Sequence, residues 1–435
     1  MTARHVAVVG AGASGTIQAL HLLREGVERV TLIEREREPG RGTAYGTRRP
    51  EHLLNVTARR MSVYPDDPDD FARWYEGRGG TPDDYAPRMT FGDYLTELMA
   101  AERGRLAIVI GEARDVVWAK AGEEVVLADG RKITADAAVL ALGNFPPAPL
   151  PGLSAEALGA LYVEDPWFGP SAEGLSERDT ILLIGTGLTA VDAALTLDAT
   201  GFRGRILALS RRGLLPRPHL RREPVSGARS DFPTRGSTLL HDVRRRAGEI
   251  GWREAVHEVR QVVQRLWGAA PHDERRRFLR HLRPWWDVHR HRIAPAVAER
   301  LDAMGSEGRF SHRAGRLLGA ERDGGAAIVT WRLRGMDASE RLRVGRIVNC
   351  SGPELDIRRA GEPLLDALLA SGRIGPDSCR LGVDVDGDSR VRDASGEPSA
   401  TLSAIGPITR GAFWETIAVA DIAKQAQAAA KRIAT

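Results

Sequence analysis

Gly10-Ala-Gly12-Ala-Ser14-Gly15 stands between an apolar run and a helical pattern, and it decides the fold of this part of the chain. The run before it, His5–Val9, predicts a buried parallel strand, and the residues after it predict a helix that Gly26 ends. A second apolar run, residues 30–34, ends in an acid. This order of strand, glycine turn, helix and strand predicts a unit that binds the pyrophosphate of a dinucleotide.

Each residue of the turn has a physical role in such a unit. Gly10 permits the tight turn, Gly12 lets a pyrophosphate approach the backbone, and Gly15 lets the helix pack closely on the strand. The start of the helix, with Ser14 in its first turn, faces the phosphates. Glu34 is expected to bind ribose hydroxyls, which suits the unphosphorylated ribose of FAD.

The same pattern returns 175 residues later, at Gly185-Thr-Gly187-Leu188-Thr189-Ala190. It follows the apolar run 180–184 and precedes a helical pattern over 188–198. The next predicted strand, 205–209, runs into Ser210-Arg211-Arg212 rather than into an acid. Arginine pairs bidentately with a 2′-phosphate, which an acid would repel, so this unit is predicted to bind NADPH. The alternative for the two arginines is an ordinary solvated surface pair.

Length and composition predict a globular protein of two or three domains. The chain has 435 residues, of which 42% are hydrophobic and 28% charged, with a formal net charge of +4. No basic tract is interleaved with aromatic residues as in known nucleic-acid modules, so no nucleic-acid partner is expected. No apolar stretch reaches ~18 residues, so no association with a membrane is expected either.

Cysteine is scarce, because Cys350 and Cys379 are the only two. They lie far apart in sequence, which excludes the close-spaced redox disulfide of many thiol–disulfide oxidoreductases. The scarcity fits a reducing compartment, and no basic, apolar leader precedes the first predicted strand, so we expect a cytoplasmic protein.

The predicted fold class is α/β, with two Rossmann-like dinucleotide-binding domains, for FAD and NADPH. Residues 1–165 and 351–435 are expected to form the FAD-binding domain. Residues 175–350 are expected to form the NADPH-binding domain, with a helical insertion at about 215–305. A run of prolines between residues 146 and 151 marks a stiff connection at the boundary.

Several stretches together resemble a bacterial FAD/NAD(P)-binding protein family of the two-dinucleotide-binding-domain flavoproteins. These stretches are 41–45, 52–55, 185–192, 209–219, 280–291 and 406–415. More distantly, the layout is similar to that of flavin-dependent N-hydroxylating monooxygenases, in which NADPH reduces FAD and oxygen reacts with the reduced flavin. The resemblance implies an NADPH-dependent flavoprotein oxidoreductase, a monooxygenase that uses molecular oxygen on a small polar or anionic metabolite.

Two departures from related flavoproteins restrict this expectation. Baeyer–Villiger and flavin-containing monooxygenases carry F-x-G-x-x-x-H between their glycine turns, and the corresponding stretches 143–147 and 162–167 contain no histidine. Many related proteins also carry a late aspartate that binds the flavin, whereas residues 403–407 read Ser-Ala-Ile-Gly-Pro. Backbone amides around Gly406 are expected to replace it.

The candidate catalytic residues are Asn55, Arg59, His289 and Arg290. Asn55, Arg59 and residues 409–413 are expected to line the isoalloxazine ring, with local backbone capping as the alternative for Asn55. Residues 280–292 are expected to form a wall of the substrate site, with arginines that hold a carboxylate. The alternative is a helix with packed tryptophans and solvated arginines. A metal site there would need a third ligand and better spacing, so none is expected.

The expected cofactor-binding residues come from both glycine turns, from the strands that follow them and from the late glycine segment. They are Gly10, Gly12, Ser14, Gly15, Glu34, Arg35, Thr43, Asn55, Val117, Gly143, Gly185, Gly187, Leu188, Thr189, Ser210, Arg211, Arg212, Gly352, Gly406, Pro407 and Phe413.

Two classes of function stay open at this point. The first is the monooxygenase described above. The second is an NADPH–flavin reductase or oxidase, or a flavin-binding redox sensor that acts through a protein partner. Neither the substrate nor the oligomeric state follows from the sequence.

Overall fold

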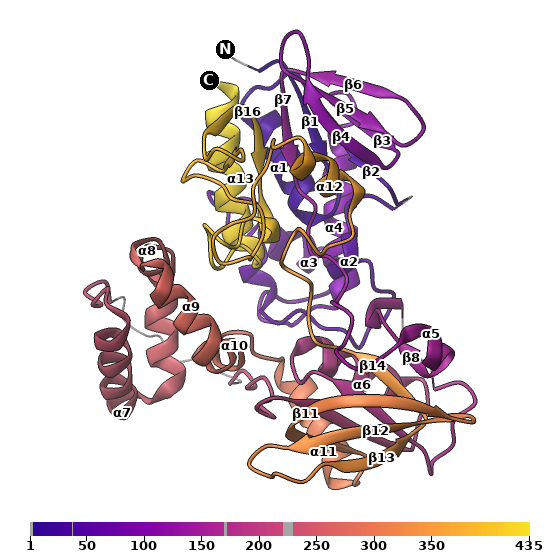
Figure 1. Ribbon diagram of the computed structural model, residues 1–435. Helices are drawn as coiled ribbons and strands as arrows, with labels where there is room; N and C mark the ends of the chain where they lie inside the picture. Colours follow the sequence, from indigo (N-terminus) through magenta and orange to yellow (C-terminus); the bar gives the residue numbers. More distant parts are fainter. Residues whose placement is uncertain (1–2, 37, 169–171, 221–228) are drawn as a thin grey trace.

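A computed structural model describes residues 3–36, 38–168, 172–220 and 229–435 (Figure 1). One sheet-centred unit carries both ends of the described chain, a second follows through two connecting segments, and a group of helices projects to one side (Figure 1). No described helix combines the length and the apolar character needed to cross a membrane.

The first unit is built on a six-stranded sheet with the order β15-β16-β7-β1-β2-β3. Its strands are β1 (His5–Val9), β2 (Arg29–Glu34), β3 (Leu106–Ile110), β7 (Ala137–Leu140), β15 (Arg390–Arg392) and β16 (Pro398–Ala404). Neighbouring strands run parallel except at the β15–β16 edge. The sheet therefore joins the first 140 residues to the end of the chain.

Both faces of this sheet are covered, which explains the continuous apolar runs of its strands. Val6 and Val8 pack in a core with α1 (Ala13–Arg24) and α13 (Val419–Ala434). Ala7 and Val9 point into a second core under the antiparallel sheet of β4, β5 and β6. The elements that complete this unit are β4 (Ala113–Trp118), β5 (Glu123–Leu127), β6 (Lys132–Ala135), α2 (Gly42–Tyr45), η1 (Ala58–Arg60), α3 (Asp70–Glu76), α4 (Arg88–Ala101), α12 (Pro363–Ala370) and η4 (Gly406–Ile408).

The second unit is built on a seven-stranded sheet with the order β13-β12-β11-β10-β9-β14-β8. Its strands are β8 (Tyr162–Val163), β9 (Thr180–Ile184), β10 (Arg205–Ser210), β11 (Phe310–Asp323), β12 (Ala326–Leu333), β13 (Glu340–Val344) and β14 (Arg346–Asn349). Three short helices flank β8 in the sequence: α5 (Ala155–Leu158) and η2 (Gly159–Leu161) before it and η3 (Pro166–Phe168) after it. Helices α6 (Leu188–Ala199) and α11 (Pro295–Ser306) cover one face of the sheet.

The boundary predicted at residue 165 falls inside this second sheet. Ile347 and Val348 of β14 pair in parallel with Tyr162 and Val163 of β8. Leu158 also belongs to the core of the second unit. The prolines between residues 146 and 151 lie just before this segment. The chain therefore enters the second unit near these prolines, earlier than the predicted boundary at residue 165.

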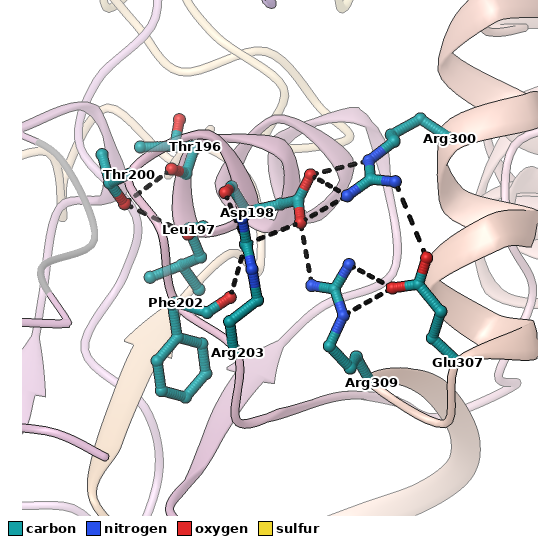
Figure 2. A network of polar contacts seen from close by, with 9 residues as sticks. All are labelled: Thr196, Leu197, Asp198, Thr200, Phe202, Arg203, Arg300, Glu307 and Arg309. Atoms are coloured by element: carbon teal, nitrogen blue, oxygen red, sulfur yellow. Dashed lines mark hydrogen bonds and ion pairs between the residues drawn. The ribbon is translucent and has the colours of Figure 1, made fainter. Parts of the chain in front are cut away.

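A charged network fixes α11 onto α6 (Figure 2). The Asp198 carboxylate, at the end of α6, accepts hydrogen bonds from Arg300 of α11 and from Arg309, just before β11. Arg203 also donates to Asp198, and Glu307 pairs with Arg309. Asp198 lies at the opposite end of α6 from the glycine turn, so this network stabilises the unit and stands apart from the nucleotide site.

The projecting helices form most of the predicted insertion, whereas α11, also within the predicted range 215–305, packs on the sheet of the second unit. The projecting helices are α7 (Gly236–Gln261), α8 (Val263–Ala269), α9 (His272–His281) and α10 (Arg283–Arg290). Trp267 of α8 stacks on Trp414 with ring centroids 4.7 Å apart and donates its indole N–H to the Gly411 carbonyl at 2.8 Å. The insertion, which belongs to the second unit by sequence, is therefore docked on the C-terminal segment of the first.

Two connecting segments join the sheet-centred units side by side (Figure 1). Pro147 in the outgoing segment forms an antiparallel bridge with Pro353 in the returning one. Glu354 donates its backbone N–H to the Pro146 carbonyl at 3.0 Å. Asn349, which is completely buried, donates to the Ala148 carbonyl at 3.0 Å.

Candidate functional site

The first glycine turn is packed so closely that two of its glycines have no room for a side chain. A Cβ on Gly10 would lie 2.5 Å from the Ala141 carbonyl oxygen, and a Cβ on Gly15 would lie 1.8 Å from the Gly10 carbonyl oxygen. Gly12 differs, because its Cβ would make only an ordinary 3.5 Å contact with Gly42. Gly10 and Gly15 are thus required by the protein itself, whereas Gly12 leaves its place free for a ligand, as a pyrophosphate site requires.

Glu34 is held in the geometry that a ribose-binding acid needs. Its carboxylate accepts the backbone N–H of Ala11 at 2.8 Å and that of Glu36 at 3.2 Å. Two backbone donors fix the carboxylate at the mouth of the glycine turn while further lone pairs stay available. The turn and the acid therefore fit the FAD that the sequence predicts.

The late glycine segment meets the first turn directly. A Cβ on Gly406 would come within 2.5 Å of the buried Ser14 hydroxyl oxygen. Gln425 on α13 accepts the Gly406 N–H at 2.9 Å and donates to the Thr409 hydroxyl at 3.0 Å. Gln425 therefore positions η4, which carries Pro407, against the start of α1.

A narrow cavity lies where the carboxyl ends of several strands meet the connecting segments. Its lining includes Gly143 after β7, Pro407 after β16 and Leu355 after β14. Gly143 has a φ of +71° and Gly352 a φ of +92°, values that favour glycine in such turns. The structure thus brings the predicted residues Gly143 and Pro407 together at the junction of the two units.

The second glycine turn repeats the geometry of the first, but a different residue ends the strand that follows it. A Cβ on Gly185 would lie 2.0 Å from the Cys350 carbonyl oxygen, whereas Gly187 has open space. Leu188 and Thr189 form the first turn of α6. Where the first unit has Glu34, this unit has Ser210, whose hydroxyl lies 2.8 Å from the Thr186 hydroxyl.

The two arginines after β10 differ in their contacts. Arg212 donates to the His281 carbonyl on α9 at 3.2 Å. Arg211 is exposed, and within the described part of the chain its side chain forms no ion pair or hydrogen bond. Arg211 is therefore the arginine whose guanidinium is available to a 2′-phosphate.

A buried polar contact joins the segment 52–55 and α4 of the first unit to α6 of the second. The His52 ring lies 2.8 Å from the Thr196 hydroxyl and 3.2 Å from the Asp192 carbonyl oxygen. Arg88 pairs with the Asp192 carboxylate at 2.9 Å, and both side chains are largely buried. Burial lowers the pKa of His52, so the neutral ring makes this contact.

We expect this contact to make stability depend on pH. The pKa of His52 is lower in the folded state than its usual ~6.5, so its stabilisation is present above that pH and lost as pH falls towards the folded-state value. Melting temperatures from about pH 7.5 to about pH 5.5 should fall less for His52→Gln than for the native protein. His241→Gln, which changes an exposed histidine, serves as the control and should follow the native curve. Parallel curves for all three proteins would refute the role of His52.

Helix α10 is anchored on the C-terminal segment by Glu415. This carboxylate is 1% exposed and accepts hydrogen bonds from Trp286 at 3.0 Å and Arg290 at 2.8 Å. The candidate catalytic residue Arg290 is thus held in a buried ion pair, and this contact favours an anchoring role.

Removal of one partner of this ion pair is expected to be costly. Arg290→Ala leaves the Glu415 carboxylate buried and unpaired, which costs about 3–5 kcal/mol. Arg290→Met together with Glu415→Gln removes both charges and keeps an acceptor for Trp286, so it should recover most of the stability. Chemical denaturation of both variants checks this; equal destabilisation by the single and double changes would contradict it.

His289 points to different neighbours from Arg290. Its ring centroid lies 6.1 Å from that of Trp252 on α7. Burial and nearby arginines, first among them Arg217, lower the pKa of His289. Its ring therefore faces α7 and the segment after β10.

Asn55 reaches the same neighbourhood through His219. The His219 ring lies 2.9 Å from the Asn55 carbonyl oxygen, and the backbone N–H of His219 donates to the Ile293 carbonyl at 2.9 Å. The structure thus links Asn55 of the first unit to the segment that follows α10.

The remaining candidates are dispersed. Arg59 forms an exposed ion pair with Asp83 at 2.8 Å and is not brought to the other catalytic candidates by any contact within the described residues. Arg35 pairs with Glu362 at 3.0 Å. Thr43 is exposed on α2, Val117 is half-buried in β4, and Phe413 is half-buried beside the first core.

Three residues that the sequence left unassigned hold the site together: His219, Glu415 and Gln425. His219 and Glu415 lie in stretches that carry the family resemblance, and this is the available signal. Gln425 had none, because a glutamine inside an amphipathic helix has no distinguishing neighbours in sequence.

Residues 7–145 match the sequence model of a family described as FAD-NAD(P)-binding, in agreement with the dinucleotide predicted at the first turn. A search of curated protein sequences gave no match.

Solved structures resemble the whole chain in fold. An ornithine hydroxylase from Pseudomonas aeruginosa in its reduced form has a TM-score of 0.66 at 16% identity, covering 99% of this chain and 98% of that one. An ornithine N-hydroxylase from Kutzneria sp. 744, described with FADred, NADP+ and L-orn, has 0.66 at 14% identity, covering 100% and 99%. L-lysine 6-monooxygenase from Pseudomonas syringae has 0.66 at 15% identity, covering 99% of each chain. The α/β class and the distant resemblance to N-hydroxylating flavoproteins are confirmed at the level of the fold.

Proposed function

We propose that this protein is an FAD-dependent oxidoreductase that takes electrons from NADPH and acts as a monooxygenase on a small polar or anionic metabolite. The observation that carries the proposal is that the two glycine turns are alike in structure, but the strand after each turn ends in a different kind of residue. The first turn presents the fixed Glu34 carboxylate, and the second presents Ser210 followed by the free Arg211. This difference supports FAD at the first turn and NADPH at the second.

When bound, FAD supplies the redox chemistry, and the chain's own task is to bind, orient and exclude water. Gly12 admits the pyrophosphate and Gln425 holds η4 in place beside Ser14. Two segments between β10 and α11 contact the first unit: the His219 ring lies 2.9 Å from the Asn55 carbonyl oxygen, and Trp267 of the insertion donates to the Gly411 carbonyl. These contacts hold the segments against the first unit, which supports exclusion of water between them.

The cysteines favour this reading over thiol–disulfide reduction. Both cysteines are free, and Cys350 is buried with its pKa raised by that burial. Cys379 also has a raised pKa because of burial, so neither residue has the lowered pKa of a reactive thiol. The scarcity of cysteine also supports a cytoplasmic location.

The alternative function is an NADPH–flavin reductase or oxidase, or a redox sensor with a protein partner. Addition of NADPH to the aerobic yellow protein separates these alternatives. A monooxygenase should consume NADPH slowly alone and faster with its substrate, so a screen of polar metabolites should find one that raises consumption without an equal release of peroxide. Reduced flavin that stays stable in air would contradict the proposal and favour the sensor.

The proposal also predicts which arginine selects the nucleotide. One charged pair with the 2′-phosphate contributes roughly 1.5–3 kcal/mol, so Arg211→Ala should raise the KM for NADPH on the order of tenfold to a hundredfold. The KM for NADH should change little. Arg212→Ala should have a smaller effect because its guanidinium donates to the His281 carbonyl.

Arg205→Ala is the matched control, since Arg205 is exposed at the other end of β10. Steady-state kinetics with both nucleotides measure the preference in all three variants. An unchanged NADPH-to-NADH preference in Arg211→Ala would count against the assignment.

A further inference from the structure

Arg410 is a buried cation whose side chain forms no ion pair of its own within the described residues, although the Asp287 and Glu415 carboxylates lie close enough to interact with its charge. It lies between η4 and α13 and is only 6% exposed. Its guanidinium lies 4.3 Å from the centroid of the Trp414 ring. Within the described residues its side chain forms no ion pair and no hydrogen bond, and its Nε is buried without a partner.

Two side chains that interact electrostatically with Arg410, Asp287 of α10 and His291 just after it, also have unused hydrogen-bonding atoms. Asp287 uses one carboxylate oxygen to accept from Arg283 at 3.3 Å. Its other oxygen lies 4.0 Å from His291 Nε2, which is too long for a hydrogen bond. Both of these atoms are buried without partners among the described residues.

The other charged side chains around Arg410 already form ion pairs with one another. Arg290 pairs with Glu415 at 2.8 Å and Arg260 pairs with Asp421 at 2.8 Å. Asp287 pairs with Arg283. Arg410 is thus the one guanidinium of this cluster left in excess, within the described part of the chain.

Contact with an aromatic ring compensates Arg410 only in part. Trp414 attracts the positive charge of the guanidinium, but its ring offers no hydrogen-bond acceptor of the kind that the five N–H donors use. Burial lowers the pKa of Arg410 to about 10, which still leaves it charged at neutral pH. A buried charge without a partner is costly, so its retention indicates an anion that arrives from outside the chain.

We propose that Arg410, Asp287 and His291 form a binding site for the carboxylate of a small organic acid. The in-plane donors of Arg410 bind the two carboxylate oxygens, and Asp287 and His291 hold a neighbouring polar group of the same molecule. A monovalent carboxylate fits better than a phosphate, because the excess is one positive charge and the nearby Asp287 carboxylate repels a divalent anion. This acid is the substrate of the enzyme, an identification that rests on the proposed function.

The position of the site supports its link to the flavin. Arg410 follows η4 by two residues, and η4 contacts Ser14 in the first glycine turn. Asp287 and His291 come from the insertion, which the sequence places in the second unit. A ligand here would touch the segment beside the FAD site and the insertion together.

One test needs no ligand. Arg410→Met keeps an apolar stem on Trp414 and removes the unpaired charge, so the holoenzyme without added acid should melt higher, on the order of 2–4 °C. FAD content should stay normal. A lower melting temperature would show that Arg410 is an ordinary structural residue, and loss of FAD would assign it to the cofactor; either result overturns the proposal.

A second test uses butyrate and its neutral analogue butyramide, titrated into the holoenzyme by calorimetry. The native protein should bind butyrate at least about tenfold more tightly than butyramide, and Arg410→Met should lose this preference. Arg260→Gln removes a paired charge from the same cluster and should keep the preference. Equal binding of the two compounds by the native protein would overturn the proposal.

These tests use neither NADPH nor oxygen, so they are separate from the proposed function. If NADPH reduces the flavin but the carboxylate preference is absent, the site alone is refuted. If the carboxylate preference is present but NADPH does not reduce the flavin, the site stands and the proposed function is refuted.

Discussion

Gly12→Val is expected to give a folded protein without the yellow colour of bound FAD. Gly12 has a φ of −72°, which valine adopts, and its Cβ would make only an ordinary contact with the protein. The added methyl groups would occupy the approach of the pyrophosphate. Loss of two charge-assisted hydrogen bonds costs about 3–6 kcal/mol, or a hundredfold to ten-thousandfold in FAD affinity.

Gly15→Ala is the informative comparison for this variant. Its Cβ would lie 1.8 Å from the Gly10 carbonyl oxygen, so the turn itself has to deform. We expect Gly15→Ala to lose stability and FAD together, whereas Gly12→Val loses FAD with its circular dichroism spectrum intact. A Gly12→Val protein that retains its full flavin absorbance would refute the assignment of the first turn.

Gly187→Val is expected to give the opposite result, a yellow protein that NADPH reduces poorly. Gly187 has a φ of −85° and open space around its missing side chain. Valine there should obstruct the nicotinamide nucleotide and leave the FAD site untouched. Loss of two charge-assisted hydrogen bonds to the NADPH pyrophosphate should lower the affinity for NADPH about a hundredfold or more.

Dithionite reduction of Gly187→Val gives the control, because it reduces flavin without a nucleotide site. Normal reduction by dithionite with slow reduction by NADPH is the expected pair of results in stopped-flow absorbance. Reduction by NADPH at the native rate and affinity would place the nucleotide elsewhere.

The two glycine turns were predictable because their sequence signals are local, although part of the steric requirement is not. Gly15 meets the Gly10 carbonyl oxygen within its own turn, whereas Gly10 and Gly185 meet the carbonyl oxygens of Ala141 and Cys350, just after β7 and β14. The strands around the two turns, such as β1 and β9, are buried on both faces, so their sequences are continuously apolar. These signals lie within about 30 residues of each other, which is the length of one βαβ unit.

The contacts between the units were not predictable, because they pair residues that lie far apart in sequence. Arg290 and Glu415 are separated by 125 positions, and His52 and Thr196 by 144. Nothing near Arg290 in sequence distinguishes a buried ion pair from a solvated arginine. Only the fold shows that Arg290 is paired and that Arg410, equally ordinary in sequence, has no ion pair among the residues that the structure describes.

Anaerobic reduction of the bound flavin by NADPH depends on both cofactor sites at once. We expect that the purified protein contains FAD, that NADPH bleaches its yellow absorbance within the time of a turnover, and that an equal concentration of NADH does so much more slowly. Admission of air should then restore the yellow colour. A protein that binds no FAD, or whose bound FAD stays oxidised in the presence of excess NADPH, would contradict the proposed function.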